Sequence, residues 1–283
     1  MPPTETEKRP KLGQNFLADR AAAARIVDAL GDTSDKVVVE IGPGRGVLTG
    51  LLAARARHLI AIELDRVLAA QLRMQYARLP KVEIIEADVL SVQFDTILGP
   101  RPGALTGIKD PRIDPARVVG NIPYYITSDI LLHLFEYHRL FDVIVIMVQL
   151  EVAQRIAAKP GTKDYGLLSA TAQLHAKVEK LFTLPPGAFA PPPKVHSAAL
   201  RLTMERRWDK LKVAPAPFTD FLKLSFGQKR KTLVNNLKDK YDPKAIRAAL
   251  AGAKVRPDVR AEALTLEKAA AIYRVLNENR TTD

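Results

Sequence analysis

Residues 37–46 read VVVEIGPGRG, a run of β-branched residues that leads directly into closely spaced glycines. The apolar run predicts a buried strand over 37–41, and the periodicity that follows predicts a helix over 47–57. Glycines at such a turn let the backbone pass close to a ligand. The last glycine of the dinucleotide fingerprint would fall at Val47, so a pyrophosphate ligand is disfavoured. A nucleoside ligand without phosphates fits better, and S-adenosylmethionine is the leading candidate; a merely tight turn is the alternative.

Outward from this stretch, apolar strands alternate with helices. Strands are expected at 59–62, 82–85, 118–119 and 143–148, with helices at 19–30, 66–78 and 128–137. Near-continuous apolar strands that alternate with helices indicate a parallel α/β sheet covered on both faces. Two β-like stretches, 176–182 and 195–203, fit an antiparallel edge pair on that sheet.

The region after residue 206 reads as helices only, over 218–226, 229–240, 243–250 and 267–277. We therefore expect a catalytic domain over 1–205, with 1–11 as a flexible tail, and a small all-helical C-terminal domain over 206–283. Residues 93–115 carry several prolines and glycines without periodicity, which predicts a long surface loop.

Polar or glycine residues stand at the ends of four successive predicted strands. These are Gly42, Glu63, Asp88 and Asn121. Ligands of open α/β sheets bind outside the carboxyl ends of the strands, so we expect the four to line one site. There Glu63 could accept hydrogen bonds from both ribose hydroxyls, and Asp88 could accept one from an adenine amine. Each of the four residues alone is better explained without a function, Glu63 for example as a solvated charge at a strand end; the ordered set is not.

The fourth strand runs into Asn121-Ile122-Pro123-Tyr124. The Asn carbonyl oxygen and a backbone carbonyl of the turn can accept hydrogen bonds from an amino group, and the Tyr ring offers a face for stacking. Proline fixes the local φ and contributes no competing N–H donor. These properties together predict a nucleobase amino-methyltransferase. The alternative is a strand-to-helix turn with a packed aromatic.

Charge points to the partner. With 43 Lys and Arg against 31 Asp and Glu, the net charge of +12 favours a polyanion. The run Lys229, Arg230 and Lys231 is expected on a helix, where it could contact the phosphates of such a partner; an ordinary solvated face is the alternative.

Several classes of protein are excluded or disfavoured. The chain has no cysteine, which rules out disulfides, thiolate nucleophiles and thiolate metal sites. His133, His138 and His175 lack metal-ligand spacing, so we expect no metal. The sequence has neither a long apolar stretch nor a targeting signal at its start, and we expect a cytoplasmic monomer that does not contact membranes.

Five motifs occur together and in order: residues 11–17 (KLGQNFL), 40–46, 62–65 (IELD), 121–124 and 188–195 (AFAPPPKV). With them the chain resembles the ribosomal RNA adenine dimethyltransferase family over nearly its whole length. The resemblance implies a Rossmann-like class I methyltransferase sheet and S-adenosylmethionine-dependent N6,N6-dimethylation.

Within that family, the chain most resembles the branch that dimethylates two adjacent adenosines near the 3′ end of small-subunit ribosomal RNA. Its substrate would be that RNA or a pre-assembled small subunit. Pro191, Pro192 and Pro193 argue against the macrolide-resistance methylases of large-subunit RNA. A non-catalytic ribosome-assembly factor on the same scaffold is a further alternative, although no residue of the expected site is lost.

The resemblance also assigns roles to single residues. Gln14, Asn15 and Leu17 would close over the cofactor, and Gly42 and Gly44 would contact it. Glu63 would hold its ribose and Asp88 its adenine amine. In the catalytic group, Asn121 and Pro123 would hold the target amine while Tyr124 and Phe189 stack on the target base. The chain departs from the family pattern in its long segment between Asp88 and Asn121, and in His196-Ser197 where Asp-Ser is usual.

Overall fold

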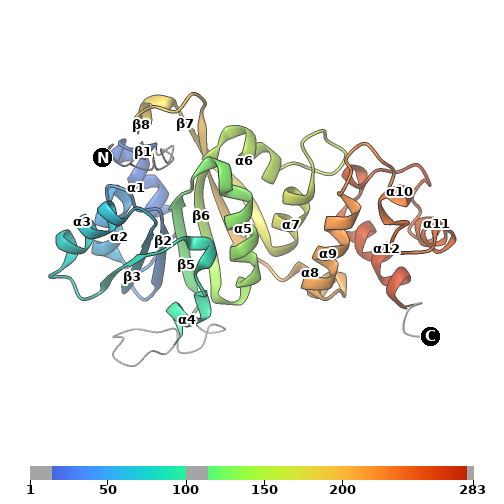
Figure 1. The fold of residues 1–283 in the computed structure, drawn as a ribbon, viewed down its shortest axis with the longest axis horizontal. Helices are drawn as coiled ribbons and strands as arrows, with labels where there is room; N and C mark the ends of the chain where they lie inside the picture. Colours follow the sequence, from blue (N-terminus) through green and yellow to red (C-terminus); the bar gives the residue numbers. More distant parts are fainter. Residues whose placement is uncertain (1–14, 100–113, 279–283) are drawn as a thin grey trace, which may run out of the picture.

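The computed structural model describes residues 15–99 and 114–278, and a seven-stranded sheet runs through its centre (Figure 1). The strand order is β4-β3-β2-β5-β6-β9-β7. The strands are β2 (Val37–Ile41), β3 (His58–Glu63), β4 (Val82–Glu86), β5 (Ala116–Asn121), β6 (Phe141–Gln149), β7 (Ala176–Leu184) and β9 (Ser197–Met204). The first five strands in this order are parallel, while β9 runs antiparallel to both β6 and β7. The predicted parallel sheet and its antiparallel edge pair are confirmed.

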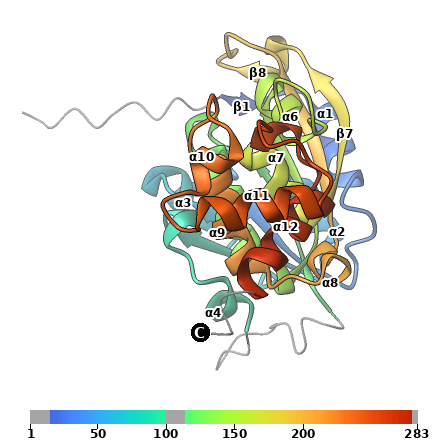
Figure 2. The same ribbon diagram turned by 90° about the vertical axis from the view of Figure 1, so that its right-hand side faces the viewer.

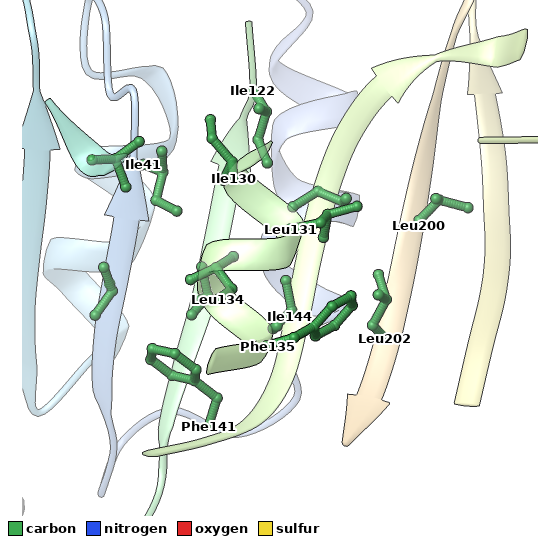
Figure 3. Close-up of a cluster of buried hydrophobic side chains, with 14 of the residues drawn as sticks. Ile41, Ile122, Ile130, Leu131, Leu134, Phe135, Phe141, Ile144, Leu200 and Leu202 are labelled. Atoms are coloured by element: carbon green, nitrogen blue, oxygen red, sulfur yellow. The ribbon is translucent and has the colours of Figure 1, made fainter. Parts of the chain in front are cut away.

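Helices cover both faces of the sheet, which is why β2 and β3 are buried along their whole length. One face carries α1 (Arg20–Asp28), α2 (Val47–Arg55) and α3 (Arg66–Tyr76). The other carries α4 (Phe94–Leu98), α5 (Thr127–Glu136), α6 (Leu150–Ile156) and α7 (Leu167–His175). Figure 3 shows the second face, where Leu131 and Leu134 of α5 lie over the strands beside Ile144.

Two of the helices that cover the sheet, α1 and α3, begin at an aspartate that caps them. Asp19 accepts hydrogen bonds from the backbone N–H groups of the first turn of α1, and Asp65 does the same for α3. Asp65 follows Glu63 at the end of β3 with one residue between them, so the cap fixes how the chain leaves the sheet. The strand end that carries Glu63 is therefore held firmly.

The C-terminal region is helical, as predicted, and faces the viewer in Figure 2. It contains α8 (Arg207–Leu211), α9 (Pro215–Ser225), α10 (Leu233–Leu237), α11 (Pro243–Gly252) and α12 (Leu266–Glu278). Its hydrophobic cluster also includes Ala170 and Leu174 of α7. One continuous core thus crosses the expected boundary after residue 205.

Two local predictions need correction. The expected loop over 93–115 begins with α4, because Phe94 and Leu98 pack into the main core; residues 100–113 lie outside the described residues. The helix expected over 229–240 begins only at Leu233, because the Thr232 side chain caps it by accepting from the Asn235 N–H. Lys229, Arg230 and Lys231 therefore lie in the turn before α10. No helix in the described part of the chain is long and apolar enough to span a membrane.

Candidate active site at the carboxyl ends of the strands

The order of the strands reverses at β2, which pairs with β3 on one side and with β5 on the other. Ligands of open α/β sheets bind at such a switch point. Ile41 lies opposite Gly120 in the register, so Gly42 and Asn121 leave the sheet side by side. A cavity of about 830 Å³, its open mouth included, lies at this edge. Its lining, mostly apolar with a few polar groups, is typical of small-molecule sites.

Most of the predicted site residues line this cavity. They are Asn15, Gly42, Gly44, Glu63, Asp88, Asn121, Pro123 and Tyr124. Leu17 and Phe189 are not among the lining residues, and Gln14 lies outside the described residues.

The glycine turn between β2 and α2 has a left-handed backbone. The φ angles are +66° at Gly42, +57° at Gly44 and +80° at Gly46, which L-residues with a side chain rarely adopt. Space is also restricted: a Cβ atom on Gly44 would lie 2.7 Å from the ring of Phe16. The turn therefore requires glycine, and it brings the segment before α1 directly onto the cavity wall.

Glu63 is held from two sides at the end of β3. Its Oε2 accepts the Gly44 N–H at 2.9 Å, and its Oε1 accepts the Asp65 N–H at 2.9 Å. Each carboxylate oxygen has a second lone pair, so both can still accept a hydrogen bond from a ligand hydroxyl. Asp88 is fixed similarly, because one oxygen accepts the Leu90 N–H at 3.0 Å.

Glu40 lies in the protein interior beneath the glycine turn. It is 1% exposed, and its Oε2 has no hydrogen-bond partner among the described residues. Burial raises the pKa of Glu40 to about 8, and the negative charge of Glu63 adds to the rise. Burial thus favours the neutral form of Glu40, whereas Glu63 lines the cavity. Glu40 is part of the motif over 40–46, but its sequence position alone did not indicate this state.

The orientation of the Asn121 side chain is set by a single contact. Its Nδ2 donates a hydrogen bond to the backbone carbonyl of Asn15 at 2.7 Å. Only the nitrogen of a side-chain amide can donate a hydrogen bond to a carbonyl, so the other amide atom of Asn121, Oδ1, remains as an acceptor. In this orientation Oδ1 can accept a hydrogen bond from an amine.

Tyr124 is anchored through its hydroxyl. Its Oη shares a hydrogen bond of 2.6 Å with Oγ of Ser197, which is fully buried on β9. Burial raises the pKa of the Tyr124 phenol, and the bond to Ser197 partly opposes that rise. The ring is thus neutral and fixed. The sequence pattern included Ser197 only as the second residue of the usual Asp-Ser pair, and no role was predicted for it.

Leu17 and Phe189 hold the segment that carries Asn15. They face each other across a small antiparallel sheet of β1 (Phe16–Leu17) and β8 (Phe189–Ala190), and both are buried in the core, at 5% and 3% exposure. Neither side chain lines the cavity, and the expected contact of Leu17 with the cofactor and the expected stacking of Phe189 on a base stay predictions. The sequence could not reveal that the two motifs pair with each other.

The three basic residues before α10 differ in their surroundings. Lys229 donates a hydrogen bond to the Lys163 backbone carbonyl at 2.8 Å and so connects the turn to the loop before α7. Arg230 and Lys231 are exposed. The latter two are the better candidates for contacts with a polyanion.

Comparisons with known proteins agree with this geometry. Residues 5–278 match the family model "Ribosomal RNA adenine dimethylase". The chain is similar to Ribosomal RNA small subunit methyltransferase A of Koribacter versatilis, with 59% identity over 96% of this chain and 95% of that protein. The Acidobacterium capsulatum protein of the same name is 55% identical over 95% of this chain and 92% of that protein.

Two crystal structures have the same architecture. The 23S rRNA methyltransferase ErmE is 29% identical with a TM-score of 0.66, over 93% of this chain and 100% of that one. A dimethyladenosine transferase from Plasmodium falciparum has a TM-score of 0.73 at 24% identity, over 94% and 98%, which bears on the fold alone.

Proposed function

The chain belongs to the ribosomal RNA adenine dimethylase family, and on that premise we propose that it dimethylates the N6 amines of two adjacent adenosines near the 3′ end of small-subunit ribosomal RNA. The family and its fold imply S-adenosylmethionine as the methyl donor. The orientation of Asn121 is the observation that carries the proposal. It presents a carbonyl oxygen, beside the anchored ring of Tyr124, to a cavity also lined by Glu63.

The residues around the cavity fit this cofactor. Glu63 would accept hydrogen bonds from the ribose hydroxyls, and Asp88 would accept one from the adenine amine. Gly42 and Gly44 present backbone without side chains, and Asn15 lies at the same wall. When bound, S-adenosylmethionine supplies an electrophilic methyl group on a sulfonium.

The chain's own residues would activate the amine of adenine. This amine is a weak nucleophile because its lone pair is delocalised into the ring. If its two N–H groups donate hydrogen bonds to Asn121 Oδ1 and the Pro123 carbonyl oxygen, the nitrogen is drawn toward tetrahedral geometry and its lone pair becomes available. The Pro123 carbonyl already receives long contacts of 3.3 Å from Ile126 N–H and Thr127 Oγ1.

Positioning then supplies most of the rate enhancement. The Tyr124 ring would stack on the extruded base and offset part of the cost of unstacking it. No strong general base is needed, because the methylated amine is cationic and loses its proton readily to solvent.

The small subunit is favoured over the large one by the relatives. The proteins 59% and 55% identical carry a small-subunit name, whereas the 23S rRNA methyltransferase is 29% identical. The proline run 191–193 points the same way. A non-catalytic assembly factor fits less well, because Glu63, Asp88, Asn121 and Tyr124 are all present at the cavity. We expect the protein to act as a monomer on small-subunit ribosomal RNA or on a pre-assembled small subunit.

The direct test incubates the protein and labelled S-adenosylmethionine with unmethylated small and large subunits, and maps modified adenosines by mass spectrometry. We expect dimethyladenosine in the small subunit only. Asn121→Ala should abolish transfer and leave cofactor binding intact, while Asn235→Ala, a change at an exposed Asn on α10, should behave as wild type. Transfer confined to the large subunit, or near-normal turnover by Asn121→Ala, would contradict the proposal.

Arg230 and Lys231 are proposed to contact RNA phosphates. Replacing both with Glu should weaken RNA binding and lower the slope of log affinity against log salt by about 1 for each lost phosphate contact. The control makes the same charge change at Lys244 and Arg247, exposed cations on α11. Lys229 is left unchanged because it also holds the Lys163 carbonyl. An unchanged salt slope would make the run an ordinary solvated surface.

A further inference from the structure

Tyr125 is the residue after Tyr124, and its surroundings are quite different. Its side chain is 66% exposed, yet the residue lines the active-site cavity. In the described part of the chain it makes no hydrogen bond and no contact with another ring, whereas Tyr124 is anchored to Ser197. Tyr125 thus places an unpartnered aromatic ring at the mouth of the site.

The backbone beneath this ring is well fixed. Tyr125 lies in the single turn η2 (Tyr124–Ile126), which is closed by the Ile126 N–H on the Pro123 carbonyl at 3.3 Å. Thr127 Oγ1 adds contacts to the Pro123 and Tyr124 carbonyls, at 3.3 and 3.4 Å. An aromatic side chain has only two rotatable angles to restrict, so a ring on a fixed turn can bind a flat partner at low entropic cost.

We propose that Tyr125 is a stacking platform for the nucleotide next to the target adenosine. The proposal rests on the proposed function. A base inside the cavity cannot cover a ring that is mostly in solvent, but the strand that delivers this base must pass the cavity mouth. When the target leaves its stack, its neighbour loses a stacking partner. The exposed ring replaces that partner, and it does so for any base because every base has a π-face.

The first test measures methyl transfer to unmethylated small subunits. Tyr125→Ala should raise the subunit concentration for half-saturation roughly 10- to 100-fold, as expected for the loss of one stacked base, while the affinity for S-adenosylmethionine is retained. Tyr125→Phe keeps the ring and should be close to wild type. Met74→Ala is the matched control, because Met74 is 81% exposed and does not line the cavity.

Three results would overturn the inference. They are an unchanged half-saturation in Tyr125→Ala, a defect in Tyr125→Phe as large as in Tyr125→Ala, and a loss confined to cofactor affinity. A wild-type protein that does not modify small subunits would instead refute the proposed function. The two failures are therefore distinguishable.

A second measurement detects stacking directly and does not depend on turnover. Two single-stranded RNA oligonucleotides carry the fluorescent base 2-aminopurine on the 5′ or the 3′ side of one adenosine. With wild type and Tyr125→Phe, stacking on the ring should keep the 2-aminopurine emission of one of the two oligonucleotides quenched. With Tyr125→Ala, the emission of that same oligonucleotide should rise. Equal emission with all three proteins on both oligonucleotides would also overturn the inference.

Discussion

Replacing Glu40 with glutamine tests whether the acid beneath the glycine turn is neutral in the folded protein. The carboxyl has an ordinary pKa of 4.5, and burial raises it to about 8. Below pH 4.5 both the folded and the unfolded chain hold the proton, and folding carries no penalty from this group. As the pH rises toward 8, the unfolded chain releases the proton while the folded chain retains it, so stability is lost.

The size of the effect follows from the two pKa values. Each pH unit between them costs the folded state about 1.4 kcal/mol, which amounts to about 5 kcal/mol by pH 8. The amide introduced by Glu40→Gln cannot ionise, so the variant should escape this loss. Any change in packing or hydrogen bonding adds a constant that does not depend on pH.

The assay is urea unfolding at about pH 5.5, 7 and 8.5. The stability of Glu40→Gln minus that of wild type should rise by about 1.4 kcal/mol per pH unit and level off above pH 8. Glu151→Gln, at an exposed acid on α6, should show no such trend. A pH-independent difference for Glu40→Gln would refute the neutral buried acid.

Three further predictions concern other contacts. Burial lowers the pKa of His175 from 6.5 to about 4, so the free energy of unfolding should fall as the pH drops between those values. His175→Gln should remove that loss in acid unfolding curves, and equal acid sensitivity of the variant and wild type would contradict this. Loss of the hydrogen bond between Tyr124 and Ser197 should lower kcat about 2- to 12-fold in each of the variants Tyr124→Phe and Ser197→Ala. The kcat of the double variant should be no lower than that of either single variant, whereas additive effects would mean that the hydrogen bond is unimportant. Gly44→Ala should weaken cofactor binding more than tenfold by calorimetry, because the new Cβ would collide with the Phe16 ring. The control is Gly187→Ala, where a Cβ meets nothing within 4 Å. Equal cofactor affinities of Gly44→Ala and wild type would refute the steric argument.

The sequence was sufficient to locate the cavity because parallel strands all end at one edge of their sheet. Gly42, Glu63, Asp88 and Asn121 could be assigned to one site from their places after apolar runs alone. The capping Thr232 was also a readable signal, and it would have placed the basic run before the helix.

The remaining contacts depend on strand order and pairing, which periodicity does not encode. Ser197 reaches Tyr124 only because β9 lies beside β6, and β6 beside β5. Leu17 and Phe189 were singled out by resemblance, and only the strand pairing shows that they pack in the core beside the segment that carries Asn15. Glu40 differs from a strand-end acid by its place inside the strand, where its side chain points beneath α2.

The small β1–β8 sheet also bears on when the protein becomes active during its own synthesis. Asn15 is made before the strands of the central sheet, yet β8, which secures the neighbouring Phe16 and Leu17, is made only after most of that sheet. Contacts between residues so distant along the chain form late in folding. A nascent chain that ends before Phe189 would hold the cofactor-facing strand ends without a fixed Asn121. We therefore expect methyl transfer only once β8 has formed, and we expect chains that end before Phe189 to be inactive.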